Sequence, residues 1–221
     1  MQKISPVCLF ILLDSLEGRE SISCSAQDCG ANNVCTCSHE IDLPYNKTIQ
    51  MVLVNHGTGG IVSHPIHLHG HTFHVLKLGY AISNTTTLLH ATPNPNISCP
   101  DSRCNNPGWS DSGWNGGRVP GLKLKNAPMK DSLVVPAGGY AVIRFRSDNP
   151  GKWLLHCHLA IHSISGMSVA LNEAKEEQTN AQVGFPMCPN FYNDATRDTP
   201  YIDKKLFDEG KFVLHMISVL P

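Results

Sequence analysis

The sequence predicts an all-β fold, a Greek-key β-sandwich or barrel with long loops. Several short segments are rich in β-branched and apolar residues, and turn-forming residues separate them. In addition, two histidine-rich motifs near residues 64–71 and 156–167 must meet in space if they form one site. One β-domain with long connections accommodates that separation better than two small domains.

The expected strands follow from local composition. They cover residues 49–55, 72–80, 132–135, 140–146, 152–157 and 166–171. Between the second and third strands, residues 81–127 hold many Asn, Pro, Gly and Ser, and we expect a long surface loop with one short helix. Residues 20–42 are rich in Cys, Ser and Asn, and residues 172–221 lose the strand pattern.

The stretch from His156 to Met167 has the residue types of a metal site. Successive side chains of a strand point to opposite faces, so Cys157 faces one way while His156 and His158 face the other. Such a triplet can serve two metal centres. His162 and Met167 follow on a segment that a loop can fold back toward the sulfur. One thiolate, imidazoles and a weak axial thioether are the ligands of a blue-copper electron-transfer site.

A second motif, HPIHLH at residues 64–69, adds three imidazoles. His67 and His69 have strand spacing and share a face, whereas His64 precedes them across a proline that breaks the regular alternation. Zinc also binds Cys and His, but structural zinc sites usually bring paired cysteines, and only Cys157 lies among these histidines. The sequence therefore favours copper over zinc.

The motifs HPIHLHGH at residues 64–71 and HCHLAIHSISGM at residues 156–167 resemble those of the last cupredoxin domain of multicopper oxidases, of the laccase and ascorbate oxidase type. Residues 128–153 are similar to the strands that lead into the second motif. The resemblance implies a cupredoxin domain over residues 35–190, after a signal peptide or Cys-rich lead-in at 1–34 and before a C-terminal tail at 191–221. It also implies a fragment of a longer, animal laccase-like protein.

The resemblance assigns a role to eight residues. The ligands of a mononuclear type 1 copper would be His64, Cys157 and His162, with Met167 in the axial position. The trinuclear cluster would use His67 for type 2 copper and His69, His156 and His158 for the type 3 pair. The catalytic residues would be Cys157, His156, His158 and His162, which lie along the expected route of the electrons. The electron donor would be a phenol, an aromatic amine or a reducing metal ion. The acceptor would be O2, which is reduced to water.

Half of the trinuclear ligands are missing from the sequence. In the family an N-terminal domain supplies them through two further His-x-His motifs, and here that pattern occurs only at 67–69, 69–71 and 156–158. We therefore expect N-terminal cupredoxin domains or another subunit as partners. The alternative function is a blue-copper electron-transfer protein without oxidase turnover.

Charge, cysteine content and glycosylation motifs indicate the cellular compartment and exclude some classes of partner. The net charge is −1 without a basic block, which argues against nucleic acid, and no apolar run approaches the roughly 18–20 residues of a membrane span. The chain has nine cysteines, of which Cys99 and Cys104 are the easiest pair to propose. Glycosylation motifs at Asn46, Asn84 and Asn96 favour a secreted, extracellular, disulfide-bonded glycoprotein over a cytosolic protein with free thiols.

Overall fold

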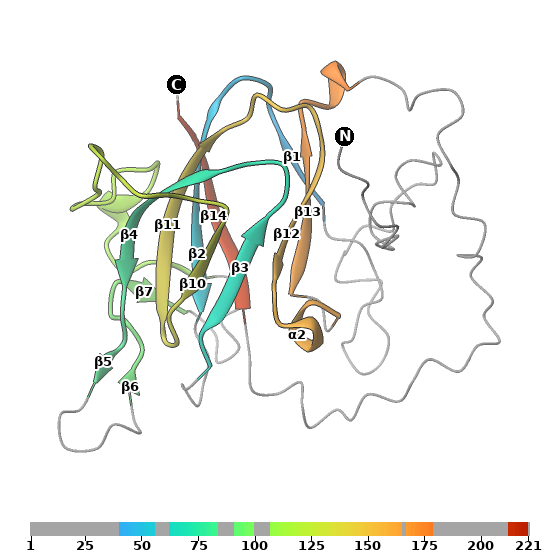
Figure 1. The fold of residues 1–221 in the computed structure, drawn as a ribbon. Coiled ribbons are helices and arrows are strands. Elements are labelled where there is room, and N and C mark those ends of the chain that lie inside the picture. The colour runs from blue at the N-terminus through green and yellow to red at the C-terminus, as the bar shows by residue number, and fades with distance from the viewer. Residues whose placement is uncertain are drawn as a thin grey trace, which may run out of the picture.

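Two five-stranded sheets pack face to face in the computed structural model, which describes residues 40–55, 62–83, 91–99, 107–164, 167–178 and 212–220 (Figure 1). The first sheet has the strand order β1-β13-β12-β3-β10 and the second has the order β14-β2-β11-β4-β9. All pairs within the two sheets are antiparallel except β1 with β13. This arrangement confirms the predicted all-β, cupredoxin-like fold.

The first sheet carries both histidine motifs. Its strands are β1 (Glu40–Leu43), β3 (His64–Leu68), β10 (Ser132–Val135), β12 (Gly151–Cys157) and β13 (Ser168–Glu173). β3 pairs with β12 in a register that sets His67 opposite His156 and Ile66 opposite Cys157. The two motifs, far apart in the sequence, are thus neighbours in one sheet.

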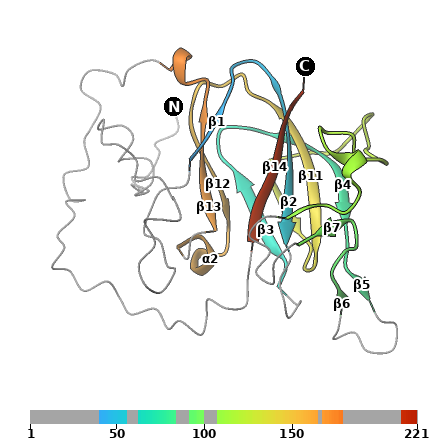
Figure 2. The ribbon, with the colours of Figure 1, turned by 180° about the vertical axis from the view of Figure 1, so that it is seen from behind.

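The second sheet supplies the other half of the core. Its strands are β2 (Thr48–Asn55), β4 (Phe73–Gly79), β9 (Met129–Lys130), β11 (Gly139–Arg146) and β14 (Phe212–Leu220). Ile143 and Phe145 of β11 are buried, while Arg144 is half-buried and Arg146 is exposed, as the alternation in the sequence predicts. Figure 2 shows β14, β2, β11 and β4 side by side.

The main core lies between the two sheets. Ile49, Met51 and Leu53 of β2 contribute from one side, and Ile66 and Leu68 of β3 from the other, all fully buried. Each such side chain contributes about 1.5–3 kcal/mol relative to an exposed one. Because β3 is anchored by these residues, the histidines between and beside them are held at fixed positions.

Residues 81–127 form more structure than the long surface loop that the sequence predicts. Their described part contains the short strands β5 (Ile82–Ser83), β6 (Ala91–Thr92), β7 (Ile97–Ser98) and β8 (Gly108–Trp109) and the 3-10 helix η1 (Ser112–Trp114). Ile97, Trp109 and Val119 are buried against Tyr140 and its neighbours in a second apolar cluster. The segment therefore covers the outer face of the second sheet.

The predicted C-terminal tail, residues 191–221, also contains a strand. Within it, β14 pairs with β2 over most of its length, from Phe212 opposite Asn55 to Leu220 opposite Thr48. After β13, residues 175–177 form a short 3-10 helix, η2 (Lys175–Glu177). The predicted lead-in, residues 1–34, lies outside the described residues. Within the described part of the chain, no helix is long and apolar enough to span a membrane.

Candidate metal centre

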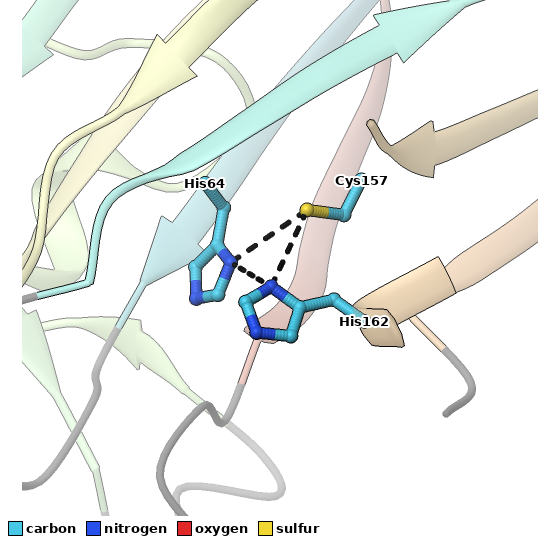
Figure 3. A group of neighbouring side chains, drawn as sticks. All are labelled: His64, Cys157 and His162. Carbon is cyan, nitrogen blue, oxygen red and sulfur yellow. Dashed lines mark hydrogen bonds between the residues drawn. The ribbon is translucent and has the colours of Figure 1, made fainter. Parts of the chain in front are cut away.

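His64, Cys157 and His162 converge on one point at the end of the sandwich (Figure 3). The Nδ1 atoms of His64 and His162 are 3.1 Å apart, and each lies 3.7 Å from the Cys157 Sγ. Bonds of about 2.0 Å to nitrogen and 2.3 Å to sulfur allow two donors of one ion to be separated by up to about 4.3 Å. The three donor atoms are therefore close enough to share one metal ion.

Three different elements position these side chains. His64 begins β3, Cys157 ends β12, and His162 lies on the short helix α2 (Ala160–Ile164). The sequence predicted a loop for this last segment, and the structure has one helical turn there. Met167 closes the turn, because its amide donates to the His162 carbonyl at 2.9 Å and its own carbonyl accepts from the Cys157 amide at 3.0 Å.

Met167 follows the turn that carries His162. Its side chain is partly buried and packs against the core cluster that contains Cys157. The two backbone hydrogen bonds tie it to both Cys157 and His162. The backbone of Met167 therefore lies beside the three-residue group, and its side chain packs against the same buried cluster as Cys157.

Burial changes the acidity of two of these groups. Burial first, and the neighbouring His162 second, lower the pKa of His64 to about 4. Burial also raises the pKa of the Cys157 thiol, although a hydrogen bond to the backbone of Leu159 opposes that shift. His64 is thus neutral and ready to donate its lone pair at ordinary pH, whereas the buried thiolate needs a compensating cation. A neutral His64 imidazole beside such a thiol fits a resident metal ion.

Four further imidazoles gather on the opposite face of the same two strands. The rings of His67 and His69 have centroids 4.8 Å apart, and those of His69 and His156 are 5.2 Å apart. The His158 ring lies 5.7 Å from that of His156 and 6.1 Å from that of His67. The Nε2 atoms of His69 and His156 approach to 3.1 Å. The sequence-predicted quartet is therefore brought together.

Backbone carbonyl groups fix the orientation of two of these rings. The Nδ1 of His67 lies 2.9 Å from the Asp131 carbonyl oxygen, and the Nδ1 of His156 lies 2.9 Å from that of Cys157. A carbonyl oxygen only accepts, so each Nδ1 must carry the proton, and in the neutral ring the Nε2 lone pair remains available to a metal. Metal-binding histidines are commonly oriented in this way.

Ser132 is a supporting residue that the sequence did not reveal as such. Its Oγ lies 2.8 Å from the Nδ1 of His67, and β10 pairs with β3 so that Ser132 is directly opposite His67. The predicted strand at 132–135 was correct, but nothing in the local sequence indicates which residue it would face. Only the pairing register supplies that information.

The surroundings lower the pKa of two rings of the quartet, His69 and His156. Burial first, and then the neighbouring imidazoles of His67, His156 and His158, lower the pKa of His69. Burial also lowers the pKa of His156, against the hydrogen bond to the Cys157 carbonyl, which raises it. Unprotonated imidazoles are the form that binds metal ions.

The Cys157 triplet separates the two groups as strand geometry predicts. Cys157 is 0% exposed and belongs to the core cluster, while His156 is half-buried and His158 is exposed on the other face. Only single peptide links separate the thiol from the two imidazoles. The arrangement therefore joins a buried three-donor site and an open four-imidazole site by a short covalent path.

His71 takes part in neither group. Its Nε2 lies 2.7 Å from Oε2 of Glu173, in a pair whose side chains are 5% and 0% exposed. Oε1 of the same carboxylate accepts a hydrogen bond from the Asn149 backbone N–H at 2.6 Å. The side-chain Nδ2 of Asn149 donates to the Gly70 carbonyl at 2.9 Å. This network, which we call the Glu173 network, holds the corner that follows His69. His74 is exposed on β4.

Comparisons with known proteins point to one family. A family model described as multicopper oxidase matches residues 11–177. Laccase-10 of Arabidopsis thaliana is 36% identical over 128 residues, covering 58% of this chain and 18% of that protein. Laccase-14 of Oryza sativa subsp. japonica is 34% identical over 150 residues, covering 68% and 21%. The solved laccase from Botrytis aclada is 25% identical, with a TM-score of 0.44, over 66% and 21%. The chain spans about a fifth of the length of these curated relatives.

Proposed function

Because the chain belongs to the multicopper oxidase family, we propose that it is the C-terminal cupredoxin domain of a laccase-like oxidoreductase that uses O2 as acceptor. The observation that carries the proposal is the two-sided site around Cys157, with a buried thiol and two imidazoles on one face and four imidazoles on the other. The two groups differ in donor set, in burial and in exposure to solvent. They are therefore suited to different tasks.

The buried group would hold a type 1 copper. His64, Cys157 and His162 offer one sulfur and two nitrogen donors within 4.8 Å of one another, and Met167 would add the weak axial sulfur. A site closed in this way excludes water from the ion and keeps its geometry nearly constant when its charge changes. These are the requirements of rapid one-electron transfer.

The four-imidazole group would hold part of a trinuclear copper cluster. His67 would bind type 2 copper, and His69, His156 and His158 would bind the type 3 pair. His69 and His158 are exposed, so the cluster face is open on the side away from the two strands. N-terminal cupredoxin domains or another subunit would cover that face and complete the ligand set.

Copper bound at the first group would accept single electrons from a reducing donor, and copper bound at the second group would pass them to O2, which is reduced to water. The donors we propose are phenols, aromatic amines or a reducing metal ion, since the curated relatives are named laccases. We propose an extracellular location, which the cysteine-rich composition and the disulfide-bonded state of Cys99 support. The pairing of Cys99 with Cys104 stays a prediction.

The test is an optical and metal analysis of the copper-loaded chain. We expect an intense thiolate-to-copper band near about 600 nm, typical of blue-copper coordination. Cys157→Ser should abolish the band, and His74→Gln, an exposed histidine outside both groups, should leave it unchanged. His156→Gln should reduce the copper content but keep the band. Copper-loaded protein without the band, or a band that survives Cys157→Ser, would refute the assignment.

The alternative function is an electron carrier, which the four-imidazole count favours for the chain taken alone. O2 uptake by copper-loaded monomer, with its mass confirmed in solution, separates the two functions. We expect a blue protein without sustained uptake until the missing domains or a second subunit are added. Sustained four-electron O2 consumption by a true monomer would show that the ligand count is wrong.

A further inference from the structure

A row of polar side chains crosses the outer face of the second sheet. Arg144 and Arg146 of β11 are two residues apart, so they share the face opposite to the buried Ile143 and Phe145. The register places Arg146 beside Thr48 of β2, and Arg144 beside His74 of β4. Figure 2 shows these three strands side by side.

This row lines a pocket of about 460 Å³. The outer-face residues Thr48, His74, Arg144 and Arg146 form one part of its lining, together with Met129 of β9. The turn at Gly70–Thr72 and the loop residue Asp148 complete the rim. The volume lies in the range of about 300–1,000 Å³ that is typical of small-molecule sites, and it is far larger than a single ion needs.

Arg144 is a cation without a counter-charge. Its Nη2 donates to the Gln50 Oε1 at 2.6 Å, but its Nε is buried and has no hydrogen-bond partner in the structure. Among the described residues the ion pairs are His71–Glu173 and Lys152–Glu40, so no carboxylate there neutralises this guanidinium. Burial lowers the pKa of Arg144, which reflects the cost of removing the charge from water.

The second guanidinium is also available. Arg146 is exposed, and its Nε donates to the Asn46 Oδ1 at 2.8 Å, which leaves its terminal nitrogens free to reach the pocket. Asp148 is the one carboxylate in the lining. Two guanidinium groups against one carboxylate leave one excess positive charge when His71 and His74 are neutral.

We propose that this pocket binds an organic monocarboxylate, whose carboxylate group is held by Arg144 and Arg146. A planar carboxylate matches the fork of a guanidinium, and its two oxygens can accept from the terminal nitrogens of the two arginines. A single negative charge balances the excess charge of the lining, whereas a phosphate dianion would exceed it. The side chain of Met129, 61% exposed, offers an apolar, polarisable wall for the body of an aromatic or aliphatic acid.

Benzoate titrated into the full 221-residue chain without copper is the direct test. Arginine side-chain Nε–H signals in NMR report pairing of the guanidinium, and calorimetry reports affinity. We expect saturable binding that shifts the Arg144 signal, and no comparable binding of benzamide, which has the same shape without the charge. Arg144→Gln and Arg146→Gln should each weaken benzoate about tenfold or more.

Lys175→Gln is the matched control, because Lys175 is an exposed cation on η2 outside the pocket lining, and its removal changes the net charge equally. It should change the affinity less than about twofold. If Arg144→Gln does not fold, the exposed Arg146 gives the decisive variant. Equal binding of benzoate and benzamide, or unchanged affinity in the folded arginine variants, would overturn the proposal. Tighter binding of inorganic phosphate than of benzoate would also overturn it.

Discussion

Glu173→Met tests whether the Glu173 network holds the corner beside the four-imidazole group. Glu173 is 0% exposed. Its Oε1 accepts a hydrogen bond from the Asn149 backbone amide at 2.6 Å, and its Oε2 lies 2.7 Å from the His71 Nε2 in a close contact that lacks hydrogen-bond geometry. Methionine has a similar volume but no comparable acceptor. The substitution therefore removes both interactions without opening a large cavity.

The expected loss follows from the Asn149 backbone amide, which the substitution leaves buried without an acceptor. A buried donor left unsatisfied costs about 1–3 kcal/mol of unfolding free energy. Glu173→Gln should cost less than Glu173→Met, because its amide oxygen still accepts from the Asn149 amide. A natural domain has only about 5–15 kcal/mol in total, so the methionine variant should lose a measurable share of its stability.

Urea unfolding of the full chain, followed by circular dichroism, measures these differences. Glu177→Gln, at an exposed position on η2, is the control and should stay within about 0.5 kcal/mol of the unmodified chain. Equal slopes against urea are needed for the comparison. A loss below about 1 kcal/mol for Glu173→Met, or equal losses for the methionine and glutamine variants, would refute the reasoning.

Three further outcomes are expected. Gly70→Ala places a Cβ 2.3 Å from the Trp153 ring at φ +72°, whereas the Cβ of Gly116→Ala meets nothing within 4 Å at φ +66°. Urea unfolding should show a loss of about 1 kcal/mol of unfolding free energy for Gly116→Ala and of at least about 2 kcal/mol for Gly70→Ala. Equal losses would exclude the clash. The pKa of His64 is lowered to about 4 in the folded chain, whereas an unperturbed histidine titrates at about 6.5, so the unfolded chain takes up this proton first as the pH falls. The unfolding free energy of the copper-free chain should therefore decrease as the pH is lowered from about 6.5 to 4, and it should decrease less steeply in His64→Gln. Identical pH dependences of the two chains would contradict this. A chelator should lower the urea midpoint of copper-loaded protein but not of Cys157→Ser; no difference would count against a copper site there.

Strand alternation was enough to predict the two faces of the site. The sequence separates Cys157 from His156 and His158, and the structure buries the thiol while leaving the imidazoles toward the other side. The strand that carries Cys157 was predicted at residues 152–157 and is observed at Gly151–Cys157, because its apolar alternation is a local property. The period of the apolar alternation determines toward which face of the sheet each side chain points.

Non-local pairing was not predictable in the same way. The tail strand β14 joins β2 across more than 150 residues of sequence, and its register depends on partners that no local pattern identifies. Likewise, Glu173 looks like an exposed charge at a strand end, and only the fold brings His71 and Asn149 to it. The covering layer formed by residues 93–99 and 107–122 is another case, since its apolar residues are spaced irregularly among turn formers.

One strand pair carries both groups of donors, and its register decides both at once. β3 and β12 align Leu68 with Leu155 and Ile66 with Cys157, and all four side chains are buried in the core. A slip of one residue would turn these apolar side chains toward solvent and bring imidazoles into the core. Losing the burial of three large aliphatic side chains costs several kcal/mol, at about 1.5–3 kcal/mol each. The same apolar alternation that builds the sandwich therefore keeps the thiol on one face and the histidines on the other.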